Sequence, residues 1–186
     1  VDEIFAEKNQ IKLEGGQDLF YDYLIVCPGI ELHWNGVEGL EGQVGVNKVC
    51  SNYAYETVNS TWQALQSFRG GRAVFTFPKG AIKCAGAPQK IMYLADEYFR
   101  RKGVREGSEI LYVAPGGSIF GIDYFRKPLE EVVARKGIQT RFGWHLKGLD
   151  SGAKQIVLEN VASGESETLD FDLLHVLSLI HISEPT

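Results

Sequence analysis

The sequence has little of what marks several large classes of protein. Its 186 residues contain three cysteines and four histidines, none in the spacing of a metal site, so we predict no metal centre. Lysine and arginine form no block and the net charge is −5, which argues against nucleic acid as a partner. No apolar run approaches the ~20 residues of a membrane-spanning helix. The composition, 44% hydrophobic, is that of a globular protein with a buried core.

The start of the chain lacks both an initiator methionine and a signal peptide. It reads VDEIFAEKNQ, and the single methionine of the sequence is Met92. We therefore expect an excerpt of a longer protein, in which other segments would carry any membrane anchor or targeting signal.

Residues 1–29 have the pattern of β-structure. The strand-like VDEIFA precedes NQIKLEGG, whose paired glycines predict a turn, and LFYDYLIVCPG predicts a buried strand stopped by Pro28 and Gly29. A helical pattern then covers residues 46–68, with an apolar face formed by Val58, Trp62, Leu65 and Phe68.

Strands and helices alternate in the next part of the chain. Apolar runs predict the strands, while helical spacing with a proline near the start and a glycine stop predicts the helices. The predicted order is strand 72–77, helix 88–102, strand 109–114, helix 128–136 and a third strand in IQTRFGW. This order predicts the α/β class, with a parallel sheet and crossover helices. Residues 145–176 return to β-hairpins, with a turn at Ser163 and Gly164.

An internal repeat links two distant parts of the chain. Residues 9–26 and 154–176 share a hairpin strand, a turn and the pattern Leu-x-aromatic-Asp-x-Leu. The matched positions are Leu19, Tyr21, Asp22 and Leu24 against Leu169, Phe171, Asp172 and Leu174. We therefore predict two Rossmann-like dinucleotide-binding units, divided into the C-terminal part of the first (1–45), a helical linker (46–70), and the second with its β-meander (71–176).

The loop KCAGAPQK places Cys84 four residues before Pro88, near the predicted start of a helix. The helix dipole and its unpaired amides favour an anion, and Lys83 and Lys90 add positive charge, so the pattern predicts a reactive thiolate. The alternative is that Cys84 is a small buried apolar residue, as free cysteines often are.

Three stretches closely resemble one protein family. They are VCSNYAYETVNSTWQALQSF, FTFPKGAIKCAGAPQKIMYLADEYFRRKG and GGSIFGIDYF. Together they resemble the sulfide:quinone oxidoreductases of mitochondria and many bacteria, which belong to the flavin disulfide reductase superfamily. The likeness covers residues 1–176 and is most specific in residues 75–103.

The resemblance implies an enzyme that binds FAD and oxidises hydrogen sulfide at a pair of cysteines, one of them Cys84. Sulfide would attack a disulfide between Cys84 and a second cysteine beyond residue 176, leaving a persulfide. Two electrons would pass through FAD to a membrane quinone, and the sulfur to a small acceptor, a thiol or sulfite. The implied location is the surface of the bacterial cytoplasmic membrane or the mitochondrial inner membrane, reached through segments absent from this sequence.

The resemblance also implies which residues meet the cofactor. Cys27, Pro28 and Gly29 would contact FAD through the backbone, with the Cys27 side chain in a packing role. Val1 would meet the adenine end of FAD through its main chain. Lys90 would either contact the flavin, where a cation stabilises negative charge, or be a solvated helix lysine.

The other cysteine, aromatic and histidine residues have less specific patterns. Some relatives have a third cysteine in the region of Cys50, for which a structural or incidental role is favoured. One apolar set would either line a passage for substrate or quinone or pack the loop before the helix at 128–136: Ile119, Phe120, Ile122, Tyr124 and Phe125. We interpret His33 as a surface residue, and His145 and His175 as strand residues.

The predicted second unit lacks the phosphate-binding pattern GxGxxG. Its loops read PKGAIKCAGAP and APGGSIFG, without the glycine spacing that lets a backbone approach pyrophosphate. This favours an electron acceptor other than NAD(P) and argues against a second hypothesis, an NAD(P)H-dependent flavin disulfide reductase. A third hypothesis is a flavin- or sulfur-binding module without turnover of its own. The FAD fingerprint itself is expected before residue 1.

The last ten residues, LSLIHISEPT (177–186), depart from the family pattern. They read like the translation of a common sequencing-library adapter, so we predict a non-native tail in which His181 and Glu184 have no function. The alternative is a divergent C-terminus.

Overall fold

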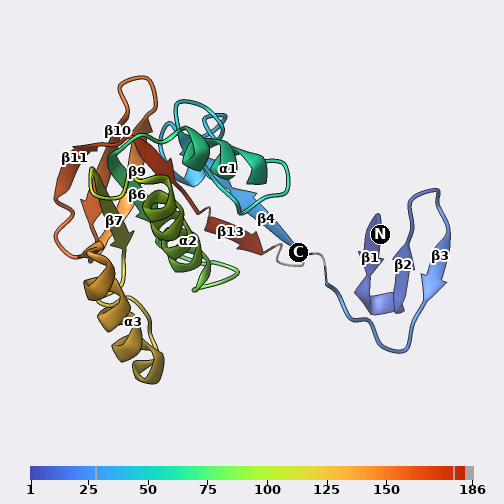
Figure 1. The fold of residues 1–186 in the computed structure, drawn as a ribbon. Coiled ribbons are helices and arrows are strands. Elements are labelled where there is room, and N and C mark those ends of the chain that lie inside the picture. Colours follow the sequence, from blue (N-terminus) through green and yellow to red (C-terminus); the bar gives the residue numbers. More distant parts are fainter. Residues whose placement is uncertain (28, 178, 183–186) are drawn as a thin grey trace. The chain divides into compact units, whose positions relative to one another are not determined.

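The computed structural model describes residues 1–27, 29–177 and 179–182, the last of these as backbone only. The described chain divides into two compact units, Val1–Ile30 and Glu31–Ile182. Their elements are labelled in Figure 1, and each unit is described by itself. Among the described residues, no helix combines the length and apolarity needed to cross a bilayer.

The first unit is a three-stranded antiparallel meander. Strands β1 (Glu3–Phe5), β2 (Gln10–Lys12) and β3 (Asp18–Phe20) pair in chain order, with the 3₁₀ turn η1 (Ala6–Lys8) between the first two. The paired glycines before β3 have φ of 94° and 84°, which confirms the predicted turn.

The predicted buried strand LFYDYLIV is wrong: only Leu19 and Phe20 of it lie in a strand, and both are exposed. Residues 21–27 form no strand, and Tyr23 and Ile25 are 93% and 87% exposed. A run that is apolar at consecutive positions becomes a strand only when a sheet lies beside it and layers cover both of its faces. Within the described part of the first unit, no strand pairs with residues 21–27 and no second layer covers them.

The second unit is built on a five-stranded parallel sheet, which confirms the predicted α/β class. Its strand order is β5-β12-β6-β7-β8. The strands are β5 (Val49–Cys50), β12 (Leu173–His175), β6 (Gly71–Thr76), β7 (Ser108–Ala114) and β8 (Gln139–Phe142). The predicted strands at 72–77 and 109–114 and the one in IQTRFGW are therefore confirmed.

Helices cover one face of this sheet and an antiparallel meander covers the other. Along β6, Ala73 and Phe75 pack in the cluster with the helices, while Val74 between them packs against the meander. This alternation follows from the two-residue period of a strand. The helices are α1 (Val58–Ser67), α2 (Ala87–Lys102) and α3 (Asp123–Lys136), and the meander is β9 (Trp144–Asp150), β10 (Gln155–Asn160) and β11 (Ser166–Asp170).

Helix α2 matches its predicted bounds, but α1 and α3 do not. Of the residues 46–68 predicted as helical, only Val58–Ser67 form a helix. The residues before Val58 form turns and β5. Helix α3 begins five residues before the predicted start and contains Pro128. At this sixth position of the helix the proline lacks the amide that would bond to the Tyr124 carbonyl, and its ring crowds that carbonyl, so the helix continues past Pro128 at a local cost in stability.

The strand pairing confirms the internal repeat. In the first meander Ile11 faces Leu19 across β2 and β3, and in the second Ile156 faces Leu169 across β10 and β11. These are the positions that the sequence alignment of the two copies places together. The two meanders therefore have the same register.

The backbone around the two meanders matches as well. Asn9 and Lys154, which occupy equivalent positions, both adopt left-handed φ, of 50° and 54°. The Tyr21 amide donates to the Asn9 carbonyl at 2.9 Å, and the Phe171 amide donates to the Lys154 carbonyl at 3.0 Å. After Phe171 the chain enters the parallel sheet as β12, whereas residues 22–27, which follow Tyr21, form no strand.

Strands β4 (Ile30–His33) and β13 (Leu179–Ile182) pair in a short two-stranded sheet. Part of the expected adapter-derived tail thus lies in β13. Residues 178 and 183–186 lie outside the described residues, and the non-native origin of the tail stays a prediction.

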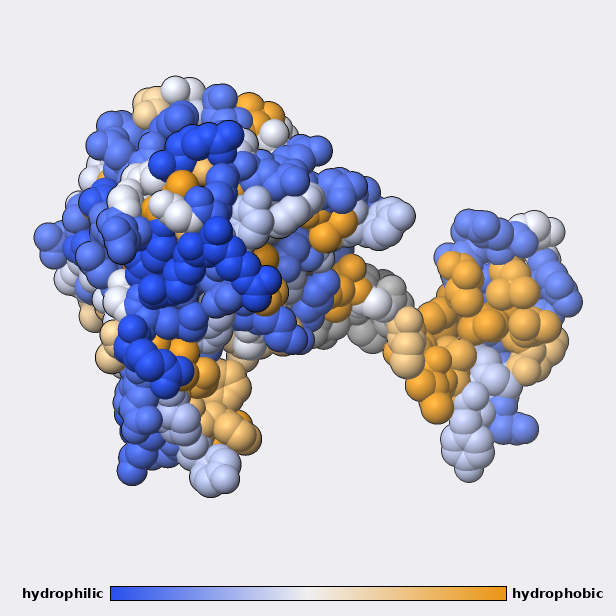
Figure 2. All heavy atoms as spheres, viewed as in Figure 1, coloured by the Kyte–Doolittle hydropathy of each residue, from blue (hydrophilic) through white to orange (hydrophobic). Residues whose placement is uncertain are grey.

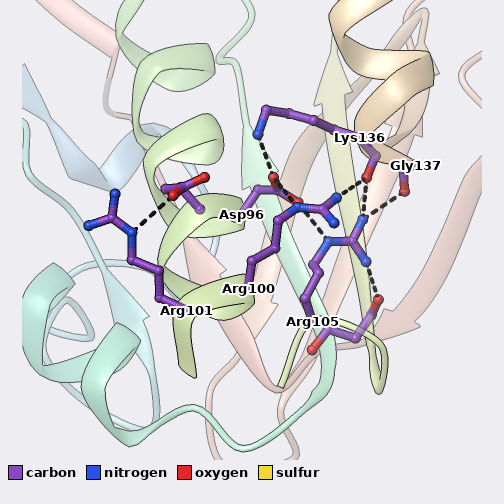
Figure 3. A network of polar contacts seen from close by, with 8 residues as sticks. Asp96, Arg100, Arg101, Arg105, Lys136 and Gly137 are labelled. Atoms are coloured by element: carbon purple, nitrogen blue, oxygen red, sulfur yellow. Dashed lines mark hydrogen bonds and ion pairs between the residues drawn. The ribbon is translucent and has the colours of Figure 1, made fainter. Parts of the chain in front are cut away.

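A buried carboxylate ties the C-terminal ends of α2 and α3 together (Figure 3). Asp96 is fully buried and bonds to Arg105 and Lys136 at 2.6 Å each and to Arg100 at 3.0 Å. Arg105 also donates to the carbonyls of Lys136 and Gly137, at 2.7 and 3.0 Å. Burial alone would raise the pKa of Asp96, but the hydrogen bonds from its three cations outweigh burial and hold the pKa below its usual value.

We expect Asp96→Asn to lower the free energy of unfolding by about 2–3 kcal/mol at pH 7, because it weakens charge-assisted hydrogen bonds to the largely buried Arg105 and the partly buried Lys136. Urea denaturation measures this. The matched control is Glu97→Gln, which removes the exposed pair with Arg101 on the same helix and should cost less than about 0.5 kcal/mol.

The Asp96 effect should also depend on pH. Because its folded pKa lies below its unfolded pKa, its contribution is complete above about pH 4 and is lost as the pH falls through the folded value. The wild type and Asp96→Asn should therefore converge in acid. Equal stability of the two proteins at pH 7 would contradict the structural role of Asp96.

Candidate functional site

Cys84 lies in the loop between β6 and α2, beyond the carboxyl end of a parallel strand. Its side chain is exposed, so the alternative of a buried apolar residue is wrong. Helix α2 begins at Ala87, and the Ala87 amide donates to the Cys84 carbonyl at 3.3 Å. Cys84 therefore sits two residues before Gly86, the N-cap, at the positive end of the helix dipole.

Lys83, which the sequence suggests as a cation beside the thiol, is bound to Tyr53. Its ammonium donates to the Tyr53 carbonyl at 2.9 Å and lies 4.3 Å from the centre of the Tyr53 ring. Its backbone amide donates to the Tyr53 hydroxyl at 3.0 Å. Burial, as the largest effect, raises the pKa of Tyr53, so the phenol stays protonated near neutral pH.

Tyr53 in turn is held at the carboxyl edge of the sheet. The Ser51 hydroxyl accepts the Tyr53 amide at 3.2 Å, and His175 Nε2 lies 2.8 Å from Asn52 Oδ1. His175 is a strand residue, as predicted, at the end of β12. Burial lowers the pKa of His175 to about 3, so its ring is neutral and can donate its Nε2 proton to Asn52.

Sequence reasoning missed Tyr53 and the link through His175. Tyr53 is 30 residues from Lys83, and Asn52 is 123 residues from His175, so no motif spacing brings them together. A buried tyrosine near the end of a short strand carries no signal in the sequence. Only the parallel pairing of β5 with β12 places them on one edge of the sheet.

Cys50 is buried, in agreement with the favoured structural role. It is 1% exposed, and burial raises the pKa of its thiol to about 12, although the neighbouring Thr61 hydroxyl has a smaller, opposing effect. A thiol in this state is a poor nucleophile.

The residues expected to meet the cofactor are divided between the two units. Val1, Cys27 and Gly29 belong to the first unit and Lys90 to the second, while Pro28 lies outside the described residues. The Cys27 side chain is exposed, so its predicted packing role is wrong within this chain, because no layer covers residues 21–27. Val1 is also exposed, and Gly29 has a left-handed φ of 84°. Their contacts with FAD stay predictions.

Two hollows flank the loop that follows β7. One, of about 300 Å³, lies next to the thiol loop, and Ala85, Tyr112, Gly116 and Gly117 are among its lining residues. The other is an apolar groove between α2 and α3, which Lys90, among others, lines. Figure 2 shows apolar side chains gathered over the lower part of α3.

The apolar set around this loop divides into packed and exposed residues. Ile119 is 3% exposed, which confirms the packing interpretation for it. The exposed members are Ile122 (54%), Tyr124 (82%) and Phe125 (50%). His33 is exposed and His145 lies in β9, both as predicted.

Curated relatives match almost the whole chain, although no family model matches it. Mouse mitochondrial sulfide:quinone oxidoreductase is 36% identical over 177 residues, covering 95% of this chain and 39% of the relative. The Dictyostelium discoideum protein of the same name is 33% identical over 172 residues, covering 92% and 38%. The resemblance to sulfide:quinone oxidoreductases is confirmed. The chain spans about two fifths of the length of these relatives.

Solved structures share the fold. The sulfide:quinone oxidoreductase of Aquifex aeolicus has a TM-score of 0.75 at 16% identity, over 93% of this chain and 40% of that one. NDH2 of Plasmodium falciparum, solved with NADH, has a TM-score of 0.61 at 13% identity, over 97% and 40%. A chain of the Tetrahymena thermophila mitochondrial ATP synthase reaches 0.76 at 18%, over 98% and 46%. Such different proteins show that this fold alone does not determine a function.

We expect iodoacetamide to label Cys27 and Cys84 but not Cys50 in the native chain at pH 8, because alkylation requires an accessible thiolate. Peptide mass spectrometry gives the extent of labelling at each site, and Cys27 serves as the internal control. In guanidinium chloride all three cysteines should react. Native labelling of Cys50 as fast as that of Cys27 would contradict its burial.

Proposed function

We propose that this chain is part of a FAD-dependent sulfide:quinone oxidoreductase in which Cys84 is the catalytic thiol. The observation that carries the proposal is the exposed sulfur of Cys84 at the N-terminal end of α2. The similarity to curated relatives of that name supports it over 92–95% of the chain. The two-unit Rossmann-like organisation, with residues 1–45 closing an FAD-binding unit, is part of this proposal.

The chain's own residues suit the sulfur chemistry. Hydrosulfide attacks a disulfide between Cys84 and a second cysteine, so that one sulfur–sulfur bond forms as the other breaks, leaving a persulfide and a thiolate. The amides and dipole of α2 favour a sulfur anion at Cys84. The family resemblance places the second cysteine beyond residue 176, and the burial of Cys50 makes Cys50 an unsuitable partner. The sulfur then leaves to a small acceptor, a thiol or sulfite.

Two features of the described residues fit FAD. Gly29 has an exposed backbone with nothing within 4 Å of the position a side chain would take, which leaves room for close approach by a ligand. Lys90 is exposed in the first turn of α2 and has no carboxylate partner among the described residues. When bound, FAD supplies a two-electron acceptor that passes electrons to a quinone. Val1, Cys27 and Pro28 complete the proposed contacts.

The electron acceptor is proposed to be a quinone rather than NAD(P). The loop after β6 carries Cys84 at the position where a nicotinamide-binding unit has its phosphate loop. Because quinones partition into bilayers, the whole protein would bind a membrane surface, the mitochondrial inner membrane or the bacterial cytoplasmic membrane. The mitochondrial names of the curated relatives support the first of these.

We expect Cys84→Ser to abolish sulfide-dependent quinone reduction by the full-length protein, with turnover falling at least about 1,000-fold, because a hydroxyl cannot form the persulfide. Anaerobic reduction of a short-chain quinone analogue, followed by absorbance, measures it. The control is Cys50→Ala, which should keep turnover within about twofold because the Cys50 thiol is buried and protonated. Undiminished turnover in Cys84→Ser would show that Cys84 is not the catalytic thiol.

A further inference from the structure

Lys83, the residue before Cys84, is held at three points by one residue, Tyr53. The Tyr53 hydroxyl accepts the Lys83 amide at 3.0 Å, the Tyr53 carbonyl accepts the Lys83 ammonium at 2.9 Å, and the Tyr53 ring lies 4.3 Å from that ammonium. Lys83 is covalently joined to Cys84, so this contact limits the positions open to the sulfur.

Tyr53 is itself a rigid support. It is 6% exposed, and its amide is bonded to Ser51, which is fully buried. The neighbouring Asn52 is bonded to His175 at the end of β12, an interior strand of the sheet. A loop that is otherwise irregular is thereby anchored to the parallel sheet next to Cys84.

The Tyr53 hydroxyl has one proton of its own. Its oxygen accepts from Lys83, and among the described residues no acceptor takes its proton. Because Lys83 is next to Cys84 in the chain, the Tyr53 hydroxyl holds the backbone of the thiol loop one residue from the sulfur.

We propose that Tyr53 is the positioning residue of the thiol loop: its hydroxyl holds the Lys83 amide and thereby keeps Cys84 at the N-terminal end of α2. The role of Tyr53 in turnover rests on the proposed function. The effect on the reactivity of Cys84 exists without flavin, sulfide or quinone.

The test is the rate of Cys84 alkylation by iodoacetamide in the full 186-residue chain, followed from pH 6 to 10 by peptide mass spectrometry. Tyr53→Phe keeps the ring and removes only the hydroxyl. We expect it to slow alkylation at pH 7 by roughly threefold to tenfold and to move the pH profile upward, because a loop released from Tyr53 no longer holds the sulfur at the helix start, where the amides and the dipole favour a thiolate. Tyr55→Phe, at a side chain that is 89% exposed, should change neither.

A second pair of variants keeps the test decisive if Tyr53→Phe folds poorly. Lys83→Gln removes the ammonium from the Tyr53 carbonyl at an exposed position, and Lys79→Gln removes an exposed charge nearby. Lys83→Gln should slow alkylation and Lys79→Gln should not. The proposal is overturned if the Tyr53→Phe profile coincides with that of Tyr55→Phe, or if Lys83→Gln matches Lys79→Gln. Because no turnover is measured, a failure here is separate from a failure of the proposed enzyme activity.

Discussion

The packing of α2 against β6 and β7 determines where Cys84 lies. Met92, Ala95 and Phe99 of the helix are fully buried against the sheet, together with Phe75 of β6. Once this face is buried, the start of α2 must lie beyond the carboxyl end of β6, and the short connection can only cross that edge. The exposed thiol, its position at the helix start and its distance from the buried Cys50 all depend on this crossover.

The central part of the fold could be predicted because its patterns are long and regular. The strands β6 and β7 are continuous apolar runs, as expected for strands buried on both faces, and α2 has both a proline near its start and a glycine stop. The start of α3 could not be predicted, since a proline suggests a helix start but is also tolerated one turn inside. Residues 21–27 have the apolar pattern of a strand, and what makes a strand is the neighbouring sheet.

The candidate site could be predicted only in part. Cys84 could be identified from the sequence because it lies just before a predicted helix, whose amides and dipole favour a thiolate. The support from Tyr53, Asn52 and His175 depends on which strands are neighbours in the sheet, and their separation along the chain hides it. The packing of Cys27 could not be predicted from the sequence. It depends on which layers cover residues 21–27, and the described part of the first unit contains none.

In the proposed function electrons enter from sulfide at Cys84 and leave to a quinone, and the loops after β6 and β7 lack the GxGxxG spacing that favours NAD(P)H. The most direct measurement is the absorbance of bound flavin in the anaerobic full-length protein, after addition of sulfide or of NADH. The account predicts that sulfide bleaches the flavin within seconds and that NADH leaves it oxidised. Rapid bleaching by NADH with no response to sulfide would contradict it.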